Sequence, residues 1–402
     1  MKTLLILNAG IEAIPGIKKA KSMGLNIVLC DKNKSAPGFK YAKYKIYKSI
    51  YDDKKIIKSL SSVFKKIKID GVITFSSDAS LSVSKIAKKY NLPGNSINSA
   101  ILSTDKLKMK KKFRESKIPI PWFKEIKDLK ELKLIIRLSR SKYILKPIDS
   151  RGSRGVLQIN KKTDLEWAYN YCKSKSNKKK IMIEKFLKGK QISTETILYN
   201  RSSCTPGMIE RNYEYLKKFS PFVIENGGQQ PPGLTQKQIK KISNLAERAG
   251  KCIGIKNGVV KGDVVLHKGR PYIIEVATRL SGGWMSSHQI PLGTGVDILS
   301  LAIKLSIGEK IDLNQANPYK KQSVAIRYLF PEQETIFKIK KNKIKKNQYI
   351  KKFMIYLKNN EVIPKLTDHT KRAGFVITAA PTKKKAILEA KKFLGKINNI
   401  SK

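Results

Sequence analysis

Residues 258–283, with the sequence GVVKGDVVLHKGRPYIIEVATRLSGG, constrain what this chain can fold into more than any other segment. Two apolar strands flank a turn predicted at His267–Arg270, and this pattern is typical of a β-hairpin. In that hairpin Asp263 lies directly opposite Glu275, and like charges in directly opposed positions destabilise a strand pair. The pair is tolerable if a cation lies between the carboxylates. A hard divalent ion, which prefers oxygen ligands, fits this position.

Two features that follow the hairpin are suited to binding anions. Arg279 comes four residues after Glu275, and its planar guanidinium matches phosphate or carboxylate. Gly282 and Gly283 follow Ser281, and the backbone N–H groups of such a segment can approach an anion closely. Metal carboxylates, an arginine and a glycine pair in this order suggest phosphoryl-transfer chemistry. The alternative from the local residues is a surface hairpin with scattered charges.

The same segment resembles the metal-binding strand pair of the ATP-grasp ligases. In that family the second strand commonly has the pattern Glu-x-Asn-x-Arg, and here residues 275–279 are Glu-Val-Ala-Thr-Arg. Ala277 replaces the asparagine that usually binds metal, so the number of metal ions stays open. The resemblance implies that Asp263 and Glu275 hold Mg²⁺ or Mn²⁺. It also implies a catalytic group that steadies the transferred phosphate, formed by Arg279, Gly282 and Gly283.

Two lysines lie in segments that are similar to phosphate-binding motifs of this family. Lys106 follows Thr104-Asp105 and precedes Ile118–Pro121, a spacing that resembles the biotin-carboxylase-like group and implies a phosphate-facing lysine. The alternative is one solvated lysine among many. Lys146 ends a predicted strand, and the small residues 149–156 follow it. This loop resembles the glycine-rich lid of the family, with Lys146 on the α- or β-phosphate, although the loop alone also fits an ordinary hairpin turn.

Residues 184–187, Glu-Lys-Phe-Leu, resemble the hinge that holds adenine in ATP-grasp enzymes. Seven residues after Glu184, where many relatives have a glutamate for the ribose hydroxyls, this chain has Gln191. Glutamine can bond two hydroxyls without charge assistance, so either nucleotide affinity is weaker or Glu195 compensates. The residues predicted to bind ATP are Lys106, Lys146, Gly152, Ser153, Gly155, Glu184, Lys185, Phe186, Leu187 and Gln191.

Residues 1–100 alternate strand and helix patterns, which predicts a parallel sheet covered by helices. Ser76-Ser77-Asp78 is predicted to cap a helix that ends near Tyr90. The Asn8-Ala9-Gly10 turn and the strand-end Asp31 weakly resemble a dinucleotide-binding motif whose full glycine fingerprint is missing. The family resemblance implies an α/β and α+β multidomain fold. Its predicted parts are a Rossmann-like lobe at 1–100, an ATP-grasp domain at 101–315 with a mobile lid at 141–200, and an α+β C-terminal domain at 316–402.

The composition excludes several classes of protein. Apolar residues make up 41% of the 402 residues, enough for real cores. No apolar run reaches the ~18 residues that a membrane helix needs. The four cysteines are scattered without paired spacing, which predicts reduced thiols in a cytoplasmic protein and no zinc site or disulfide framework.

The net charge of +54 invites a nucleic-acid interpretation that the pattern does not favour. Only 12 of the 84 basic residues are arginine, and the lysines are spread along the whole chain. One lysine run, 340–346, is predicted to be a solvated hairpin turn. Coding bias explains this distribution without a polyanion partner, so no specific nucleic-acid partner is predicted. The charge should still attract ATP and acidic substrates.

Some residues are candidates for the substrate side of the site. The polar loop 225–232 matches the position of a substrate loop in amino-acid-type ATP-grasp ligases, and otherwise it is a surface loop. Arg327 and Asp368-His369 could border the substrate pocket, whereas the lone His288 is more often structural.

The resemblance implies a carbon–nitrogen ligase that uses ATP and Mg²⁺ to activate a carboxylate as an acyl phosphate, which an amine then captures. The implied partners are two small molecules, an amino-acid-like carboxylate and an amine. ADP and phosphate are the implied products. Whether the protein forms a homodimer is left open. Two other classes remain. One is a carboxylase-type ATP-grasp enzyme that acts on bicarbonate, although no segment resembles a biotin carrier. The other is a non-catalytic nucleotide- or nucleic-acid-binding protein.

Overall fold

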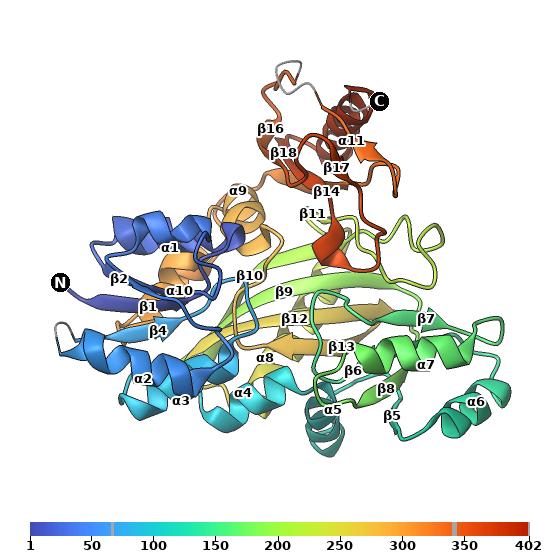
Figure 1. Ribbon diagram of the computed structural model, residues 1–402, viewed down its shortest axis with the longest axis horizontal. Helices are drawn as coiled ribbons and strands as arrows, with labels where there is room; N and C mark the ends of the chain where they lie inside the picture. The colour runs from blue at the N-terminus through green and yellow to red at the C-terminus, as the bar shows by residue number, and fades with distance from the viewer. Residues whose placement is uncertain (66–67, 340–343, 401–402) are drawn as a thin grey trace.

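The computed structural model describes residues 1–65, 68–339 and 344–400, excluding the side chains of 63–64 and 398–400. Three lobes are joined by one long sheet: the N-terminal lobe, the lobe of residues 123–185 and the C-terminal lobe (Figure 1). Residues 340–343 of the predicted lysine-rich turn lie outside the described residues.

The N-terminal lobe is a parallel sheet in the order β3-β2-β1-β4. All five residues of β1 are buried, as expected for a parallel strand covered on both faces. Leu4 and Ile6 face one core, which includes Ile17, and Leu5 and Leu7 face the other. The elements are β1 (Thr3–Leu7), α1 (Ile14–Ser22), β2 (Asn26–Cys30), β3 (Tyr44–Ile46), α2 (Asp53–Phe64), β4 (Gly71–Ile73) and α3 (Ser80–Lys89). The Rossmann-like lobe predicted from the sequence is therefore present.

The predicted helix cap at 76–78 is wrong. Helix α3 begins at Ser80, and its N-cap is Ala79, whose methyl group cannot accept a hydrogen bond. Ser77 instead bonds Thr74, with 2.6 Å between the hydroxyl oxygens. Asp78 forms ion pairs with Arg279 and Arg151. The carboxylate that sequence reasoning assigned to a helix is thus used in a contact between lobes.

A small antiparallel sheet in the order β5-β8-β6-β7 forms the second lobe. Two helices pack on it in one core, which includes Leu132, Leu145 and Ala168. Helices α4 (Ile97–Thr104) and α5 (Lys106–Glu115) connect this lobe to the first. The elements of the lobe are β5 (Phe123–Ile126), α6 (Leu129–Arg137), β6 (Tyr143–Pro147), β7 (Leu157–Ile159), α7 (Leu165–Ser174) and β8 (Ile181–Lys185).

The long sheet runs in the order β13-β12-β9-β10-β11-β14-β18-β16. Its first four strands pack against α8 (Gln236–Cys252), and β11, β14 and β18 pack against α11 (Lys383–Ile400). The C-terminal strands continue the same sheet because β11 pairs with β14. The strands are β9 (Lys190–Tyr199), β10 (Ser202–Arg211), β11 (Gly228–Gln230), β12 (Gly258–His267), β13 (Arg270–Ala277), β14 (Ser323–Leu329), β16 (Ile350–Ile355) and β18 (Gly374–Ala380).

The remaining elements link these lobes. Helix α10 (Ile298–Ser306) returns to pack against α1 and β4, so the N-terminal lobe is completed by residues from late in the chain. Helix α9 (Ile290–Thr294) contacts β10 and β14, and β15 (Ile336–Phe337) pairs with β17 (Glu361–Val362). The predicted fold class, α/β followed by α+β in several lobes, is confirmed.

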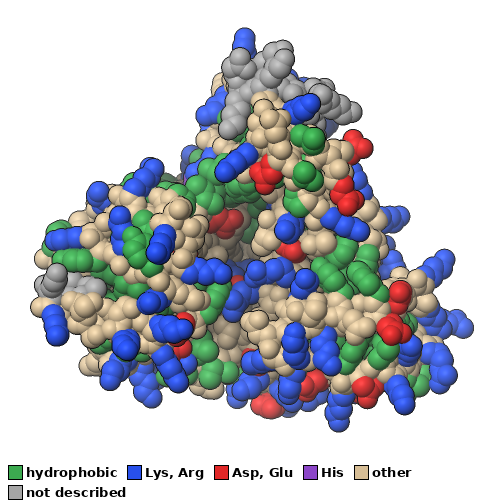
Figure 2. Space-filling view, in the orientation of Figure 1, with side chains coloured by type: hydrophobic (Ala, Val, Ile, Leu, Met, Phe, Trp, Pro, Cys, Tyr) green, Lys and Arg blue, Asp and Glu red, His purple; other side chains and the backbone are tan. Residues whose placement is uncertain are grey.

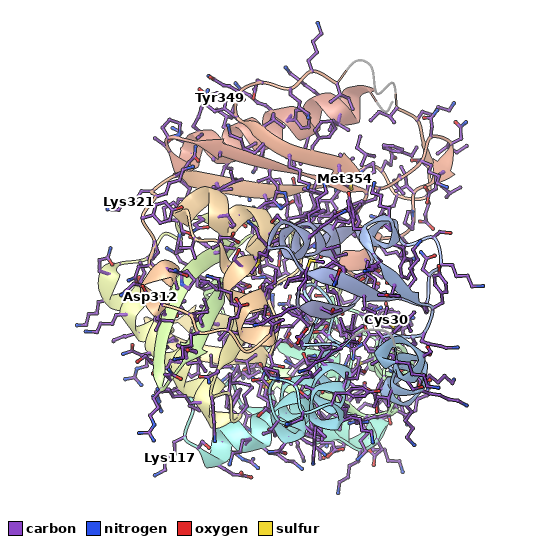
Figure 3. All side chains as sticks on the ribbon, turned by 90° about the vertical axis from the view of Figure 1, so that its left-hand side faces the viewer. Cys30, Lys117, Asp312, Lys321, Tyr349 and Met354 are labelled. Atoms are coloured by element: carbon purple, nitrogen blue, oxygen red, sulfur yellow. The ribbon has the colours of Figure 1, made fainter. Side chains whose placement is uncertain are left out.

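All four cysteines are free thiols, and Cys30 lies inside the N-terminal lobe (Figure 3). Within the described ranges, no helix is long and apolar enough to cross a membrane.

The basic side chains are distributed over the whole molecule. Lys and Arg cover every lobe of the visible face rather than one element (Figure 2). From the side, Lys117 and Lys321 point away from the body of the protein (Figure 3). On the visible face (Figure 2) this distribution gives a diffuse positive field.

Duplex DNA is therefore expected to bind only weakly and without sequence preference. The binding should weaken steeply as salt rises, because it depends on release of counterions from phosphates. Fluorescence anisotropy with two unrelated duplexes across a salt series would measure this. Tight binding of one duplex over the other at physiological salt would contradict the prediction.

Candidate active site

The hairpin of β12 and β13 brings the two predicted metal carboxylates together. The turn lies where it was predicted, at His267–Arg270, and its two central residues, Lys268 and Gly269, have φ of 46° and 75°. Two consecutive positive φ values are typical of the tight turn that matches strand twist. The pairing of Asp263 with Glu275 is confirmed, because a bulge at Ile274 shifts the register by one residue.

Both carboxylates are charged and are held by cations. Asp263 pairs with Lys261 and with Arg211, the latter at 3.2 Å, and accepts a hydrogen bond from Ser193 at 2.8 Å. Glu275 lies 3.3 Å from the Lys106 ammonium. Burial would raise both pKa values, but the neighbouring positive charges outweigh it, and both pKa values are lowered.

Lys261 is a site residue that the sequence analysis missed. Its ammonium contacts Asp263 and also lies 3.9 Å from Glu275. Residues two apart on a strand face the same side, so the spacing of Lys261 and Asp263 on β12 was a usable signal. Lys261 provides part of the positive charge that the opposed carboxylates need.

The carboxylate pair fits a divalent ion. The atoms that would bind the ion are carboxylate oxygens in their anionic state, and Mg²⁺ and Mn²⁺ prefer such ligands. The described residues contain no group of three or more His, Cys, Asp or Glu side chains placed to hold a metal. Ala277, the departure from the family pattern, adds only a methyl group to the cavity. An ion bound by Asp263 and Glu275 would therefore complete its shell with oxygens from a nucleotide, a substrate or water.

The two phosphate-facing lysines predicted from the sequence lie near the hairpin. Lys106 donates to the Ser150 carbonyl at 2.8 Å in addition to its pair with Glu275. Lys146 pairs with Glu184 at 2.6 Å, and both side chains are buried. A second buried lysine, Lys110, lies 3.3 Å from Glu184, and burial lowers its pKa to about 8. Glu184 thus holds two ammonium groups, a role that the sequence analysis did not predict.

The glycine-rich loop after β6 has the backbone geometry expected of its residues. Gly152, Ser153 and Gly155 all have positive φ, between 60° and 75°. A Cβ at Gly155 would lie 2.8 Å from side-chain atoms of Lys175 and Pro147, so this glycine serves close packing. Ser153 is held by His369, with 3.1 Å between Oγ and Nε2. This hydrogen bond attaches the loop to the C-terminal lobe.

The predicted hinge residues Lys185, Phe186 and Leu187 line the cavity together with Gln191. Glu195, the proposed substitute for a ribose-binding glutamate, is turned away from this end of the cavity. Its Oε1 accepts hydrogen bonds from the Ser281 N–H at 2.8 Å and from the Ser286 hydroxyl at 3.0 Å. Burial raises its pKa to about 7. Glu195 therefore orients the 281–286 segment.

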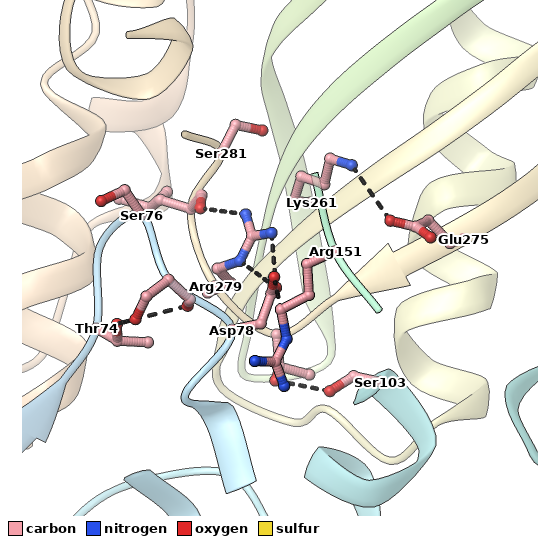
Figure 4. A network of polar contacts seen from close by, with 12 residues as sticks. Thr74, Ser76, Asp78, Ser103, Arg151, Lys261, Glu275, Arg279 and Ser281 are labelled. Carbon is pink, nitrogen blue, oxygen red and sulfur yellow. Dashed lines mark hydrogen bonds and ion pairs between the residues drawn. The ribbon is translucent and has the colours of Figure 1, made fainter. Parts of the chain in front are cut away.

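Arg279 connects the hairpin to the N-terminal lobe. Its Nε and Nη2 atoms both lie 2.7 Å from the Asp78 carboxylate (Figure 4). Arg151 of the glycine-rich loop lies 3.6 Å from the same carboxylate and 4.3 Å from the ring of Tyr51. Burial would raise the pKa of Asp78, but the two arginines lower it overall. One carboxylate thus joins three segments that are far apart in sequence.

The Gly282-Gly283 segment is close to carboxylates in this structure. The Gly283 N–H donates to Glu12 at 2.9 Å, and Gly283 has φ of 64°. A Cβ at Gly282 would lie 2.8 Å from the same Glu12 oxygen. Glycine is therefore needed at both positions, and an oxyanion at Gly283 would have to share or replace the Glu12 contact.

The candidates for the substrate side have different positions. Glu225 and His369 line the cavity. Arg327 is buried and donates to the Gly228 carbonyl and to Gln229, so it faces the sheet and not the cavity. His288 contacts Lys352, with 3.1 Å between nitrogens, and burial lowers its pKa to about 4.

One cavity of about 790 Å³ brings the site together, a size typical of cofactor sites. Tyr213, Tyr328 and Arg372 also line it, and the sequence analysis did not identify them. Of the residues predicted to bind ATP or metal or to act in the transfer, all except Gly155 line the cavity: Lys106, Lys146, Gly152, Ser153, Glu184, Lys185, Phe186, Leu187, Gln191, Asp263, Glu275, Arg279, Gly282 and Gly283.

Comparison with known families defines the class of protein. Residues 103–283 match the ATP-grasp domain, and residues 17–94 match the ATP-grasp N-terminal domain. The chain thus contains an ATP-grasp domain preceded by an ATP-grasp N-terminal domain, and the predicted resemblance to the ATP-grasp ligases is confirmed.

Individual proteins and solved structures are also similar to this chain. The carbamoyl phosphate synthase large chain of Clostridium botulinum (strain Langeland) is 23% identical over 307 residues, 74% of this chain and 27% of that protein. The chain thus spans about a quarter of the length of the first such relatives. The L-amino acid ligase of Bacillus licheniformis superposes with a TM-score of 0.83, 19% identity and coverage of 98% and 97%. Phosphoribosylglycinamide synthetase of Anaerococcus prevotii superposes with a TM-score of 0.74, 22% identity and coverage of 99% and 98%.

Proposed function

We propose that this protein is an ATP-dependent carboxylate–amine ligase that acts through an acyl phosphate. The observation that carries the proposal is the charge arrangement in one cavity. Two anionic carboxylates, Asp263 and Glu275, lie beside Lys106 and Lys261, and Arg279 lies on the same strand-to-loop segment. Such a set can hold a metal-bound polyphosphate and neutralise the charge that develops during phosphoryl transfer.

The residues divide into a nucleotide part and a transfer part. Lys185, Phe186 and Leu187 would hold the adenine, Gln191 the ribose, and Lys146 a phosphate. Gly152 and Ser153 would cover the phosphates. Bound Mg²⁺ would neutralise phosphate charge at Asp263 and Glu275. Arg279, with the backbone at Gly282 and Gly283, would steady the transferred group.

The chemistry explains why this protein would need ATP. An amine cannot displace oxide from a carboxylate, because that leaving group is too poor. Attack by a carboxylate oxygen on the γ-phosphorus forms an acyl phosphate and releases ADP. The amine nitrogen then attacks the acyl carbon, phosphate leaves with the carbon–oxygen bond electrons, and the nitrogen loses a proton.

Water must be excluded while the acyl phosphate exists, because water would hydrolyse it. The glycine-rich loop is suited to this task. It contacts the N-terminal lobe through Arg151 and the C-terminal lobe through Ser153. Both contacts would have to form again after each exchange of nucleotide.

An amino-acid-like carboxylate is the proposed substrate, and a small amine is the proposed acceptor. Support comes from the polar lining by Glu225, His369 and Arg372, and from the fold shared with an L-amino acid ligase. We also propose a cytoplasmic location, which the four free cysteines favour.

The test is product analysis over a panel of amino acids and small acids with Mg²⁺ and ATP. The expected products are ADP and phosphate, and hydroxylamine is expected to trap the activated acid as a hydroxamate. AMP with pyrophosphate would overturn the mechanism. Turnover that depends on bicarbonate alone would instead favour the carboxylase class.

A further inference from the structure

The cavity contains a carboxylate that the proposed ligase chemistry does not use. Glu12 follows the Asn8–Gly10 turn and lines the cavity at the N-terminal lobe. Among the residues that the structure describes, Glu12 and Glu210 are the cavity carboxylates that form no ion pair, whereas Asp78, Glu184, Glu225, Asp263 and Glu275 each pair with lysine or arginine. Glu210 accepts the Gly233 N–H at 2.7 Å. In a chain with 84 basic and 30 acidic residues, a carboxylate without a cationic partner in a lysine-rich cleft is notable.

The Glu12 carboxylate is oriented by the loop that ends the transfer site. One oxygen, Oε2, accepts the Gly283 N–H at 2.9 Å. This contact turns the carboxylate toward the 279–283 segment, where Arg279 begins the loop. The other oxygen, Oε1, remains able to accept a hydrogen bond from a ligand.

A second acceptor lies at the same corner. A Cβ at Gly282 would be 2.8 Å from Glu12 Oε2 and 3.6 Å from the Ser76 carbonyl oxygen. Glycine at this position therefore leaves space in front of both acceptors. Glu12 and Ser76 both line the cavity, so a donor group that entered here would meet a carboxylate and a carbonyl.

The backbone that carries Glu12 is firmly anchored. Asn8 Oδ1 accepts the Gly10 N–H at 2.7 Å, and Asn8 Nδ2 donates to the Ser76 hydroxyl at 3.2 Å. The strand-end Asp31 accepts the Ala9 N–H at 3.0 Å. The Asn8–Gly10 turn and Asp31, which weakly resemble a dinucleotide motif in sequence, here fix the position of Glu12.

We infer that Glu12, with the Ser76 carbonyl, binds the ammonium group of a zwitterionic substrate whose carboxylate is activated beside Arg279 and Lys261. An ammonium has several N–H donors and one positive charge, which suits one carboxylate plus a carbonyl. This inference rests on the proposed function and assigns the substrate's amino group to a residue.

The test compares amino acids with their des-amino acids, such as alanine with propionate and phenylalanine with 3-phenylpropionate. Binding is measured by calorimetry, and turnover by phosphate release with Mg·ATP. Wild-type protein is expected to prefer the amino acid. Glu12→Gln keeps the size of the side chain and an acceptor for the Gly283 N–H, so the fold should survive, as a melting curve would check.

In Glu12→Gln the amino acid is expected to bind roughly 10- to 100-fold more weakly, the range for a hydrogen bond to a charged group. Binding of the des-amino acid should change little, so discrimination between the two should fall. The control is Glu332→Gln, which removes the same charge from an exposed position and should leave discrimination unchanged.

The possible failures are separable. Equal use of both acids by the wild type, or unchanged discrimination in Glu12→Gln, overturns the inference and leaves the ligase proposal intact. Amino-acid binding that depends on Glu12 without phosphate release supports the inference and overturns the ligase proposal. No binding or turnover of any amino acid in the panel overturns the inference.

Discussion

Replacement of Glu275 by alanine is expected to lower ATP turnover at least ~100-fold while the protein keeps its fold. That size corresponds to the loss of one group that stabilises charge in a transition state. Glu275 is one of only two acidic side chains on the facing strands of the hairpin, and Ala277 offers no replacement oxygen. The lysines near Glu275 would remain satisfied in the variant, because Lys106 also donates to Ser150 and Lys261 also pairs with Asp263.

Phosphate release measures this effect, and thermal unfolding measures the fold. The melting temperature is expected to move by less than about 5 °C, since no buried apolar contact is lost. Glu332→Ala, which removes an exposed carboxylate, is the matched control and should keep full turnover. Wild-type turnover in Glu275→Ala would show that the proposed metal site is wrong.

The parts of the fold that sequence reasoning predicted are those with strong periodic patterns. The β1 strand was identifiable from the four consecutive apolar residues Leu4–Leu7, which are buried on both faces of a parallel sheet. The opposed carboxylates Asp263 and Glu275 and the turn at His267–Arg270 were predicted from the hairpin, but the bulge was not. A tight two-residue loop and a bulge at Ile274 together give the same pairing. The order of the motifs was therefore sufficient to predict this carboxylate pair, whereas the exact register of the two strands could not be predicted.

Sequence reasoning did not identify some site residues, and these residues form contacts with partners that are far away in the chain. Asp78 resembles a helix cap locally, and only the fold brings it to Arg279, 201 residues later. Glu12 and Gly283 are separated by 271 residues. No periodicity or local propensity carries such information, because these contacts depend on how three lobes meet at one cavity. Lys110 could not be identified from the sequence for a different reason. It is one lysine among many, and only its burial in the structure distinguishes it.

Replacement of Arg279 by lysine is expected to lower turnover about 100-fold while ATP binding changes less than about 3-fold. Lysine keeps the positive charge but loses the fork by which Nε and Nη2 both contact Asp78 at 2.7 Å. The proposed nucleotide contacts of Lys146 and the hinge do not include this side chain, so nucleotide affinity should be largely preserved. A transferred phosphoryl group, in contrast, needs a cation held at a fixed position.

Two measurements on Arg279→Lys separate these effects: calorimetric titration with a non-hydrolysable ATP analogue, and phosphate release with a saturating acid substrate. Arg270→Lys is the matched control, because Arg270 is exposed at the start of β13 and Arg279 follows the end of that strand, and it should behave as the wild type. Equal losses of nucleotide binding and turnover in Arg279→Lys would assign the arginine to ground-state ATP binding. Retained turnover in Arg279→Lys would show that the transfer step does not need the guanidinium of Arg279, because a single positive charge would then be sufficient.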